Sequence, residues 1–319
     1  MYKILTLNNI AVEGLRRLPR ERYEVASEIA HPDAILLRSH NMHDMDIPDT
    51  VAAVGRAGAG TNNIPCDALA HRGVPVFNAP GANANAVKEL TIAGLLLGAR
   101  NLCDAREYVK TLDDSGEGLK KKVESGKKQF VGFELPGKTL GVIGLGAIGV
   151  EVANAALDLG MKVVGYDPAI TVRNAWQLSS GVEQEETLDQ LCQHADVVSC
   201  HVPPIDATRG IVNADRIALM NDGAVLINFA RGGVVDDRAA LAALDSGKLH
   251  AYVTDCPTSE LIGHPGVIAL PHLGASTGEA EENCAIMVAE NVKDYLENGN
   301  IRHSVNYPEA RLPRLDAWR

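Results

Sequence analysis

The sequence predicts an α/β protein with two lobes, each built on a doubly wound parallel sheet, and a cleft between them. Short apolar runs typical of buried strands alternate with segments of helical spacing over most of the 319 residues. In residues 139–167, a glycine-rich turn joins such a strand to such a helix. Alternation of this kind favours parallel strands with helices on both faces of the sheet.

The first lobe is predicted from four apolar runs near the N-terminus. We expect its strands at residues 3–7, 34–39, 52–58 and 75–78. Residues 83–112 are apolar at helical spacing, which predicts a helix that leads to the second lobe. A polar, glycine-containing stretch follows at residues 113–132, and the segment between Arg100 and Gly132 suggests an arm of a homodimer.

The second lobe is predicted from a longer series of strands. We expect them at residues 140–143, 161–166, 196–202, 224–229, 251–254 and 267–270. Ser276 and Glu279 have the spacing of a capping box, which predicts a last helix that reaches Asn298 and ends at Gly299. We expect this helix to return to the first lobe.

Residues 139–167, TLGVIGLGAIGVEVANAALDLGMKVVGYD, have the pattern of a dinucleotide fingerprint. Gly144, Gly146 and Gly149 form a G-x-G-x-x-G directly after an apolar run, where the backbone must turn sharply and approach a pyrophosphate closely. Asp167 ends the second strand, and a carboxylate there accepts the ribose hydroxyls and repels a 2′-phosphate. The unit therefore predicts a Rossmann-like or flavodoxin-like lobe that binds NAD rather than NADP. Ala147 adds no positive charge, so backbone amides and the helix dipole must hold the pyrophosphate.

Composition excludes several classes of protein. With 46% hydrophobic and 22% charged residues, the chain is not disordered. Its net charge of -11 gives no attraction for nucleic acid or anionic lipid, so we expect small-molecule partners. The apolar run at the N-terminus is too short and is interrupted too early to be a secretory signal. No other apolar run approaches the length of a membrane helix. We therefore expect a cytoplasmic protein.

Cysteine and histidine spacing gives no sign of a metal site. The six cysteines lie in apolar segments without CxxC pairing, which predicts reduced core thiols. His40, His43 and Asp44 are close in sequence, but further ligands at fitting spacing are lacking. We expect a polar loop there and no metal.

Three candidate catalytic residues follow strands of the second lobe, where an open α/β sheet binds its ligands. Arg231 opens the turn ARGG, and a guanidinium binds a planar carboxylate with two prongs. Glu260 and His272 follow the next two strands, and a carboxylate beside an imidazole raises its pKa and fixes its tautomer, as a proton acceptor requires. Taken singly, each residue also has a structural explanation: Arg231 as part of a surface ion pair, Glu260 as a solvated charge and His272 as part of a capped turn.

The sequence resembles the D-isomer-specific 2-hydroxyacid dehydrogenases over nearly its whole length. The matching stretches are LRS at 37–39, GRAGAGTNNI at 55–64, NAPGANANAVKEL at 78–90, GKTLGVIGLGAIG at 137–149, HVPP at 201–204, NFARGGVVDD at 228–237 and PHLGAST at 271–277. The resemblance implies that Arg231, Glu260 and His272 are the family's catalytic arginine, acid and histidine. It also implies direct hydride transfer to NAD, a substrate-binding lobe of residues 1–98 and 279–319, and an NAD-binding Rossmann domain of residues 99–278.

The resemblance further implies which residues contact the cofactor. Asp167 would hold the ribose, and the remaining contacts are expected at Gly144, Gly146, Ala147, Ile148, Gly149, His201, Val202, Pro203, Phe229, Ala230, Asp255, Gly274 and Ala275.

The implied substrate is less narrowly defined than the reaction. The stretches are most similar to members that oxidise D-3-phosphoglycerate to 3-phosphohydroxypyruvate, the first step of serine biosynthesis. The expected substrate-binding residues are Arg38, Ser39, Arg56, Gly58, Ala59, Gly60 and Lys127. Lys127 belongs to a lysine run that a solvated surface explains equally well. Another D-2-hydroxyacid such as glycerate, or glyoxylate in the reverse direction, stays open, as does a non-enzymatic NAD-sensing scaffold on the same fold.

Two departures from the family pattern stand out. The loop between Glu260 and His272 is shorter than usual. Longer relatives continue into a C-terminal regulatory domain, so we expect either that this control is absent or that the sequence is truncated. Glutamate rather than glutamine at position 260 argues against a formate dehydrogenase.

Overall fold

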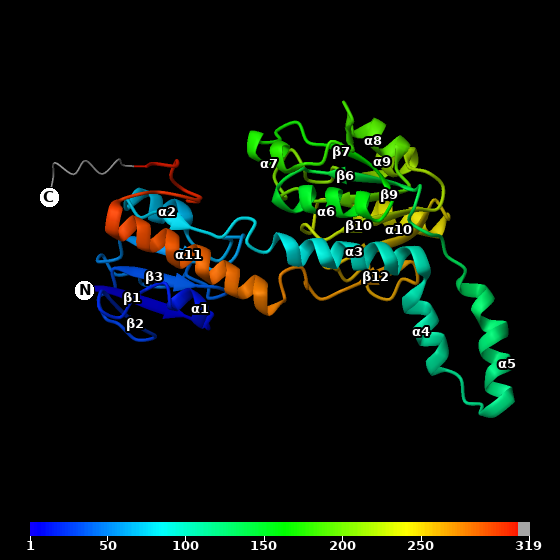
Figure 1. Cartoon of the computed structure of the whole chain (residues 1–319), viewed down its shortest axis with the longest axis horizontal. Coiled ribbons are helices and arrows are strands. Elements are labelled where there is room, and N and C mark those ends of the chain that lie inside the picture. The colour runs from blue at the N-terminus through cyan, green and yellow to red at the C-terminus, as the bar shows by residue number, and fades with distance from the viewer. Residues whose placement is uncertain (312–319) are drawn as a thin grey trace. The chain divides into compact units, whose positions relative to one another are not determined.

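The computed structural model describes residues 1–311, which divide into two compact units (Figure 1). Unit 1 joins residues 1–83 to the C-terminal segment from Ala275, and unit 2 is continuous over Ala84–Gly274. The predicted lobe boundaries are later in the chain, after residues 98 and 278. Residues 84–98 belong to unit 2 because helix α3 (Ala84–Arg100) packs on helix α6 (Ala147–Asp158) and on strands β10 (Ala224–Asn228) and β11 (Leu249–Thr254).

Unit 1 contains a five-stranded parallel sheet in the order β2-β1-β3-β4-β5, which is the flavodoxin-like order. The strands are β1 (Tyr2–Leu7), β2 (Tyr23–Ala26), β3 (Ala34–Leu37), β4 (Ala53–Arg56) and β5 (Val76–Phe77). Helices α1 (Val12–Leu15) and α11 (Gly278–Asn298) pack on one face, where Ile4 and Leu36 meet Val288 in one core cluster. Helix α2 (Cys66–His71) contributes Leu69 to the core on the other face.

Unit 2 contains a seven-stranded parallel sheet in the order β12-β11-β10-β9-β6-β7-β8. The remaining strands are β6 (Thr139–Ile143), β7 (Lys162–Tyr166), β8 (Val182–Gln184), β9 (Val197–Cys200) and β12 (Val267–Ala269). Counted within the unit, this is the Rossmann order with one strand added at an edge. Both sheets are parallel and covered by helices, so the predicted α/β class is confirmed.

Successive residues of the unit 2 strands alternate between two apolar cores. Leu140 and Val142 of β6 pack with α3 and α6, whereas Ile143 packs on the other face. That face is covered by α8 (Leu188–His194), α9 (Ala214–Leu219) and α10 (Asp237–Asp245). Because both faces are buried, the strands read as continuous apolar runs, which is why they could be predicted.

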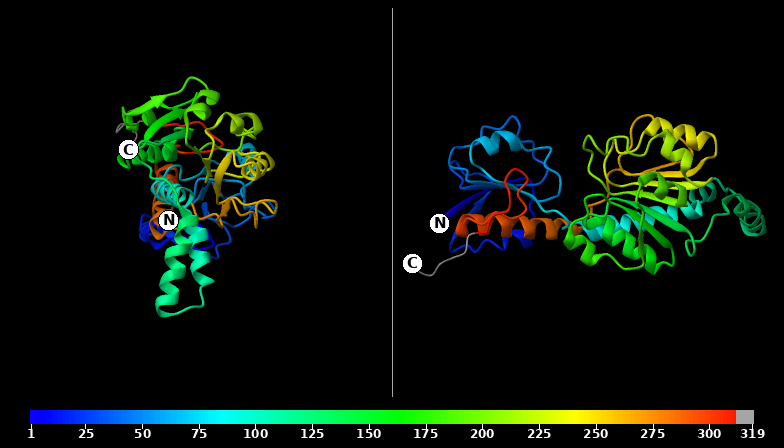
Figure 2. Two further views of the ribbon diagram at one scale, coloured as in Figure 1. Left: turned by 90° about the vertical axis from the view of Figure 1, so that its right-hand side faces the viewer. Right: turned by 90° about the horizontal axis from the view of Figure 1, so that it is seen from above.

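A helical arm extends from unit 2 between α3 and β6 (Figures 1 and 2). The predicted single helix over residues 83–112 is wrong, because Asn101 takes a left-handed conformation, with φ of 50°, and separates α3 from α4 (Leu102–Lys110). Helix α5 (Gly116–Gly126) and a 3-10 turn (Lys127–Phe130) follow in the stretch predicted only as polar. The Tyr108 and Phe130 rings lie 5.4 Å apart and join the two sides of the arm.

The predicted last helix is present, but its cap differs. Helix α11 begins at Gly278, and the Thr277 hydroxyl accepts a hydrogen bond from the Ala280 amide, so Thr277 rather than Ser276 is the N-cap. Gly299 ends the helix with φ of 72°, as predicted. Within the described residues, no helix combines the length and apolar character needed to cross a bilayer.

Candidate functional site

The carboxyl edge of the unit 2 sheet gathers most of the predicted site residues. Strand order reverses direction between β6 and β9, which lie side by side while their following segments lead to opposite sides. A crevice forms outside the strand ends at such a switch point. The segments that follow β6, β9, β10, β11 and β12 carry the glycine turn, His201, Arg231, Asp255 with Glu260, and His272.

The glycine turn has a distinct reason for each glycine. Gly144 has φ of 91°, which side chains rarely adopt. A Cβ at Gly149 would lie 1.9 Å from the Gly144 carbonyl oxygen, so only glycine allows the helix to pack this closely on the turn. A Cβ at Gly146 would meet nothing within 4 Å. Open space at Gly146 and the uncapped N-terminus of α6 together fit an approaching phosphate group.

Asp167 is fixed beside this turn. Its Oδ2 accepts a hydrogen bond of 2.8 Å from the Leu145 amide, and its Oδ1 accepts one of 2.9 Å from the Ala169 amide. Each carboxylate oxygen retains a second lone pair that can accept a hydroxyl hydrogen. Asp167 thus fits the predicted ribose contact. The turn and this acid together meet the steric and polar requirements of a dinucleotide.

His201 lies directly after β9 and is predicted to contact the cofactor. Its Nε2 lies 2.9 Å from the hydroxyl oxygen of Ser199, which is fully buried. Burial lowers the pKa of the His201 imidazole to about 4. The ring is therefore neutral near pH 7 and adds no positive charge for a phosphate. The neighbouring Val202 side chain packs against the core of the sheet, and the Pro203 carbonyl accepts the hydroxyl of Thr208.

Arg231 projects from a turn that a buried asparagine holds. Asn228, at the end of β10 and 1% exposed, donates from Nδ2 to the Arg231 carbonyl at 3.0 Å and accepts from the Ala230 amide at 3.1 Å. The Arg231 side chain itself is exposed. Sequence reasoning missed Asn228, although an amide at the end of an apolar strand was a usable signal. Phe229, by contrast, is 4% exposed and packs in the core, so only its backbone can face a ligand.

His272 lies beside Cys256 rather than beside Glu260. Its Nδ1 is 3.9 Å from the Cys256 sulfur, and its amide donates to the Asp255 carbonyl at 2.9 Å. The His272 backbone has φ of 49°, a left-handed conformation that residues other than glycine seldom adopt, and its side chain is exposed. Burial raises the pKa of the Cys256 thiol to about 11, so it is protonated near pH 7. No motif or spacing in the sequence singles out Cys256.

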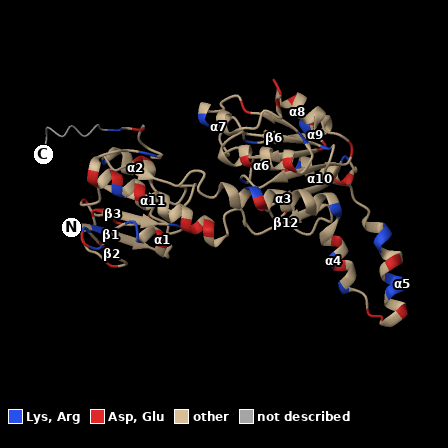
Figure 3. Ribbon diagram, in the orientation of Figure 1, with Lys and Arg blue, Asp and Glu red and all other residues tan. Residues whose placement is uncertain are grey.

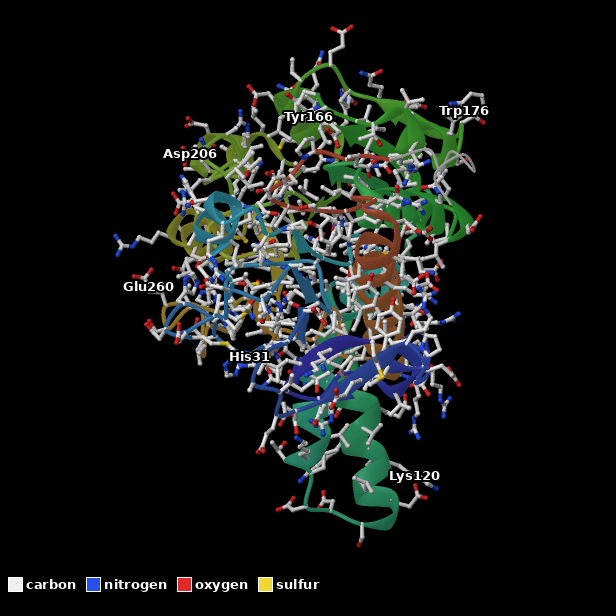
Figure 4. The ribbon with its side chains drawn as sticks, turned by 90° about the vertical axis from the view of Figure 1, so that its left-hand side faces the viewer. His31, Lys120, Tyr166, Trp176, Asp206 and Glu260 are labelled. Atoms are coloured by element: carbon white, nitrogen blue, oxygen red, sulfur yellow. The ribbon has the colours of Figure 1, made fainter. Side chains whose placement is uncertain are left out.

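Glu260 is exposed at the periphery of the molecule (Figure 4). Its carboxylate pairs with the guanidinium of Arg238 of α10, at 3.0 and 3.3 Å. The Arg238 guanidinium lowers the pKa of the Glu260 carboxyl. No hydrogen bond joins Glu260 to His272 in the part of the chain that the structure describes. The predicted contact between them is therefore absent here, because Arg238 holds the acid and Cys256 occupies the space next to Nδ1.

The predicted substrate-binding residues of unit 1 cluster after β3 and β4. Arg38 pairs with Glu281 at 2.7 Å, and Arg56 Nε donates to the Arg38 carbonyl at 3.1 Å. The Gly58 amide donates within its own turn to the Arg56 carbonyl, which removes it from the predicted anion contact. Among the described residues, the amides of Ala59 and Gly60 have no acceptor. Ser39 is exposed.

Two predicted residues lie apart from these groups. Lys127 is in the arm of unit 2 and pairs with Glu124. Ala275 begins the second segment of unit 1, whereas Gly274, whose amide donates to Asp255 Oδ2 at 3.2 Å, ends unit 2.

The family model for the D-isomer specific 2-hydroxyacid dehydrogenase, NAD binding domain, matches residues 92–274. This range includes the glycine turn, Asp167, Arg231 and His272 and is more than half of the chain. The chain belongs to the D-isomer-specific 2-hydroxyacid dehydrogenase family. The match confirms the expected cofactor, which is NAD.

Similar curated proteins are named D-3-phosphoglycerate dehydrogenase. Those of Methanocaldococcus jannaschii, Bacillus subtilis and Homo sapiens are 37%, 34% and 34% identical, over 92%, 97% and 99% of this chain. The chain covers only 56%, 59% and 58% of their respective lengths.

Solved structures share the fold. NAD+-bound 3-phosphoglycerate dehydrogenase of Entamoeba histolytica has a TM-score of 0.72 at 25% identity, covering 96% of this chain and 99% of that chain. The holo form of Rhodotorula graminis D-mandelate dehydrogenase has a TM-score of 0.80 at 25% identity, covering 96% of this chain and 98% of that chain.

Proposed function

We propose that this protein catalyses the NAD-dependent oxidation of D-3-phosphoglycerate to 3-phosphohydroxypyruvate, the first step of serine biosynthesis. The observation that carries this proposal is the 34–37% identity, over at least 92% of the chain, to the three relatives of that name. Arg231 and His272 support it, because both follow strands at the carboxyl edge of the NAD-binding sheet.

The cofactor site is proposed from the fit of the glycine turn. The amides at the start of α6 would hold the pyrophosphate, and Asp167 would accept the ribose hydroxyls. When bound, NAD supplies the hydride acceptor. Ala147 and neutral His201 leave the pyrophosphate without a side-chain cation from these positions, so the helix dipole and the amides carry more of its binding.

Arg231 and His272 divide the substrate chemistry. The exposed Arg231 guanidinium binds the C1 carboxylate through two parallel hydrogen bonds. The His272 imidazole, in its neutral form, takes the proton of the C2 hydroxyl while C2 loses its hydride. Glu260 favours the resulting imidazolium once it leaves Arg238, and its exposure leaves it free to do so.

Recognition of the substrate's anionic groups is proposed for unit 1. The Ala59 and Gly60 amides suit the C1 carboxylate, and Arg38 and Arg56, with Ser39, suit the phosphate. For Arg38 to bind the phosphate, its ion pair with Glu281 must break. The phosphate carries more negative charge than the Glu281 carboxylate and can therefore replace it. Lys127 is a further candidate from a neighbouring subunit.

A homodimer is proposed from the arm. Helices α4 and α5 contain no buried residue, and Leu102, Val109, Val123 and Val131 are each at least 40% exposed. Of these, Val123 lies in α5, which also carries lysines and acids (Figure 3). Apolar side chains exposed on a projecting helix pair favour coverage by another copy of the arm. A monomeric mass by light scattering would contradict the dimer.

The test is NADH formation from D-3-phosphoglycerate, D-glycerate and D-lactate at mildly alkaline pH. We expect a preference for the phosphorylated acid, and a loss of turnover of roughly a hundredfold or more in Arg231→Ala. Arg238→Ala, which removes another exposed arginine of unit 2, is the matched control and should keep its turnover. Preference for an unphosphorylated acid would agree with the proposed hydride transfer but would refute D-3-phosphoglycerate as the substrate. NAD binding without turnover of any acid would favour a scaffold.

A further inference from the structure

We propose that Asp255, Cys256 and His272 form a binding site for a thiophilic divalent cation of the Zn²⁺ class. Asp255 and Cys256 follow β11, and His272 follows β12. One ligand atom from each residue lies within 4.8 Å of the others. The site joins a carboxylate, a thiol and an imidazole.

The two distances from the Cys256 sulfur suit tetrahedral coordination. Cys256 Sγ lies 3.4 Å from Asp255 Oδ1 and 3.9 Å from His272 Nδ1. Zinc takes oxygen and nitrogen ligands at about 2.0–2.2 Å and sulfur at about 2.3 Å, which places neighbouring ligands of a tetrahedron roughly 3.3–3.8 Å apart. The two distances measured from the sulfur therefore need adjustments of only a few tenths of an ångström.

The backbone holds the two segments of the site together. The His272 amide donates to the Asp255 carbonyl at 2.9 Å, and the Gly274 amide donates to Asp255 Oδ2 at 3.2 Å. The Cys256 amide donates to the Thr254 hydroxyl at 3.1 Å. Oδ2 is bonded to the Gly274 amide, and Oδ1 accepts the Cys256 thiol hydrogen. When the cation binds, the thiol loses this proton to solvent, so that the thiolate and Oδ1 both become ligands.

Burial and ligand type indicate the class of cation. Asp255 is 2% exposed, whereas His272 is exposed, so the site is anchored in the protein and open on the imidazole side. Three protein ligands with an open fourth position are typical of zinc sites that also bind water. A thiol and an imidazole favour Zn²⁺, Co²⁺ or Cd²⁺ over Mg²⁺ and Ca²⁺, which prefer oxygen ligands alone.

Among the residues that the structure describes, this is the one such group. His40, His43 and Asp44, considered from the sequence, do not form one, and His43 Nε2 lies 3.0 Å from the Asn62 carbonyl oxygen. Sequence spacing could not reveal the group, because Cys256 and His272 are 16 positions apart and belong to loops after different strands.

The consequence of occupancy rests on the proposed function. A cation on Nδ1 would hold the imidazole that is proposed to take the substrate proton, and it would engage Asp255, which is expected to contact NAD. Binding of the cation and binding of NAD would then oppose each other. A cation bound at this site would therefore inhibit the proposed reaction. Binding of the cation can be measured by itself, whether or not the protein oxidises any hydroxyacid.

The test uses Co²⁺ as the probe, because a thiolate ligand gives Co²⁺ a near-ultraviolet charge-transfer band and tetrahedral geometry gives intense visible bands. The full chain, reduced and free of NAD, is titrated with Co²⁺, and bound Co²⁺ is then displaced with Zn²⁺, which binds such ligands more tightly. We expect one Co²⁺ per chain with both sets of bands. Cys256→Ser should lose the charge-transfer band, and both Cys256→Ser and His272→Gln should bind Co²⁺ at least tenfold more weakly.

Cys103→Ser is the matched control, since Cys103 is another partly exposed thiol of unit 2 outside the group, and it should bind like the parent chain. Thermal unfolding of each variant verifies that it is folded. Bands that persist in Cys256→Ser, or disappear in Cys103→Ser, would overturn the site. Unchanged Co²⁺ affinity in a folded His272→Gln would also overturn it, because a lone thiol would then be the ligand. Absence of turnover alongside these bands would refute the proposed function but leave the site intact.

Discussion

Arg238 and Glu260 form a two-pronged ion pair at the surface of unit 2, with Nη2 3.0 Å from Oε1 and Nε 3.3 Å from Oε2. The acid that the family resemblance assigns to catalysis is thus held by an arginine and not by His272. Both side chains are exposed, so the pair contributes little to stability and its partners exchange readily.

Glu260→Gln and Arg238→Gln distinguish a catalytic acid from a surface ion pair. If Glu260 acts on the imidazole during turnover, Glu260→Gln lowers kcat roughly tenfold or more, because the imidazolium loses its carboxylate. Arg238→Gln breaks the same ion pair and leaves kcat unchanged. Steady-state kinetics and thermal unfolding of both variants measure this. Equal kcat values in the two variants would argue against a catalytic role for Glu260.

Substitutions at two glycines of the turn distinguish an effect on folding from an effect on cofactor binding. Gly149→Ala should destabilise the protein by about 2–4 kcal/mol, because its Cβ would lie 1.9 Å from a backbone oxygen. Gly146→Ala should fold normally, since nothing lies within 4 Å of the added Cβ. It should nevertheless raise the Kd for NAD by roughly tenfold or more, because the methyl group occupies the space left for the pyrophosphate. Urea unfolding and calorimetric NAD titration check both; tight NAD binding by Gly146→Ala would place the cofactor elsewhere.

Asp167 should set the preference for NAD over NADP. Asp167→Asn removes the charge that repels a 2′-phosphate, so the ratio of the Kd values for NADP and NAD should fall by roughly tenfold. Asp158→Asn, at the exposed end of α6, is the control for a general loss of negative charge. An unchanged ratio of the two Kd values in Asp167→Asn would show that this carboxylate does not contact the ribose.

His201 should make stability depend on pH. Its pKa is about 4 in the folded protein against an ordinary value of 6.5, so between these values the unfolded chain binds a proton that the native chain excludes. Stability therefore falls as pH decreases through this interval, by at most about 3 kcal/mol from this group, and not further below it. His201→Asn should reduce that slope, whereas His31→Gln, at an exposed histidine, should not. Urea unfolding at several pH values provides the measurement, and equal slopes in His201→Asn and the parent chain would contradict it.

The interior strands and the edge strands β5 and β12 could be predicted from the sequence, whereas the edge strands β2 and β8 could not. Strands β6, β9 and β10 are buried on both faces and read as apolar runs. Strands β2 and β8 are at sheet edges, and only Tyr23 of β2 and no residue of β8 is buried. Helix α5 has no buried residue at all, so no apolar stripe marked it. Patterning detects burial, and these elements bury little.

The site was predictable where backbone geometry dictates the residue type. Gly144, Gly149 and Asp167 satisfy local requirements within one strand-turn-helix unit. The partners of Glu260 and His272 depend instead on which loops meet after folding. Arg238 reaches Glu260 from α10, and Cys256 reaches His272 from the segment after β11. Spacing along the chain contains no record of either contact.

Deuterium transfer from D-3-phosphoglycerate labelled at C2 tests the central claim most directly. One measurement identifies the substrate that is oxidised, the cofactor that is reduced and the C2–H bond that breaks. The purified chain is incubated with the labelled acid and NAD, and the reduced cofactor is examined by mass spectrometry. We predict NADH that carries the deuterium, formed by the parent chain and strongly diminished in His272→Gln. Reduced cofactor without deuterium, or no reduced cofactor while labelled D-glycerate yields it, would contradict the proposed reaction.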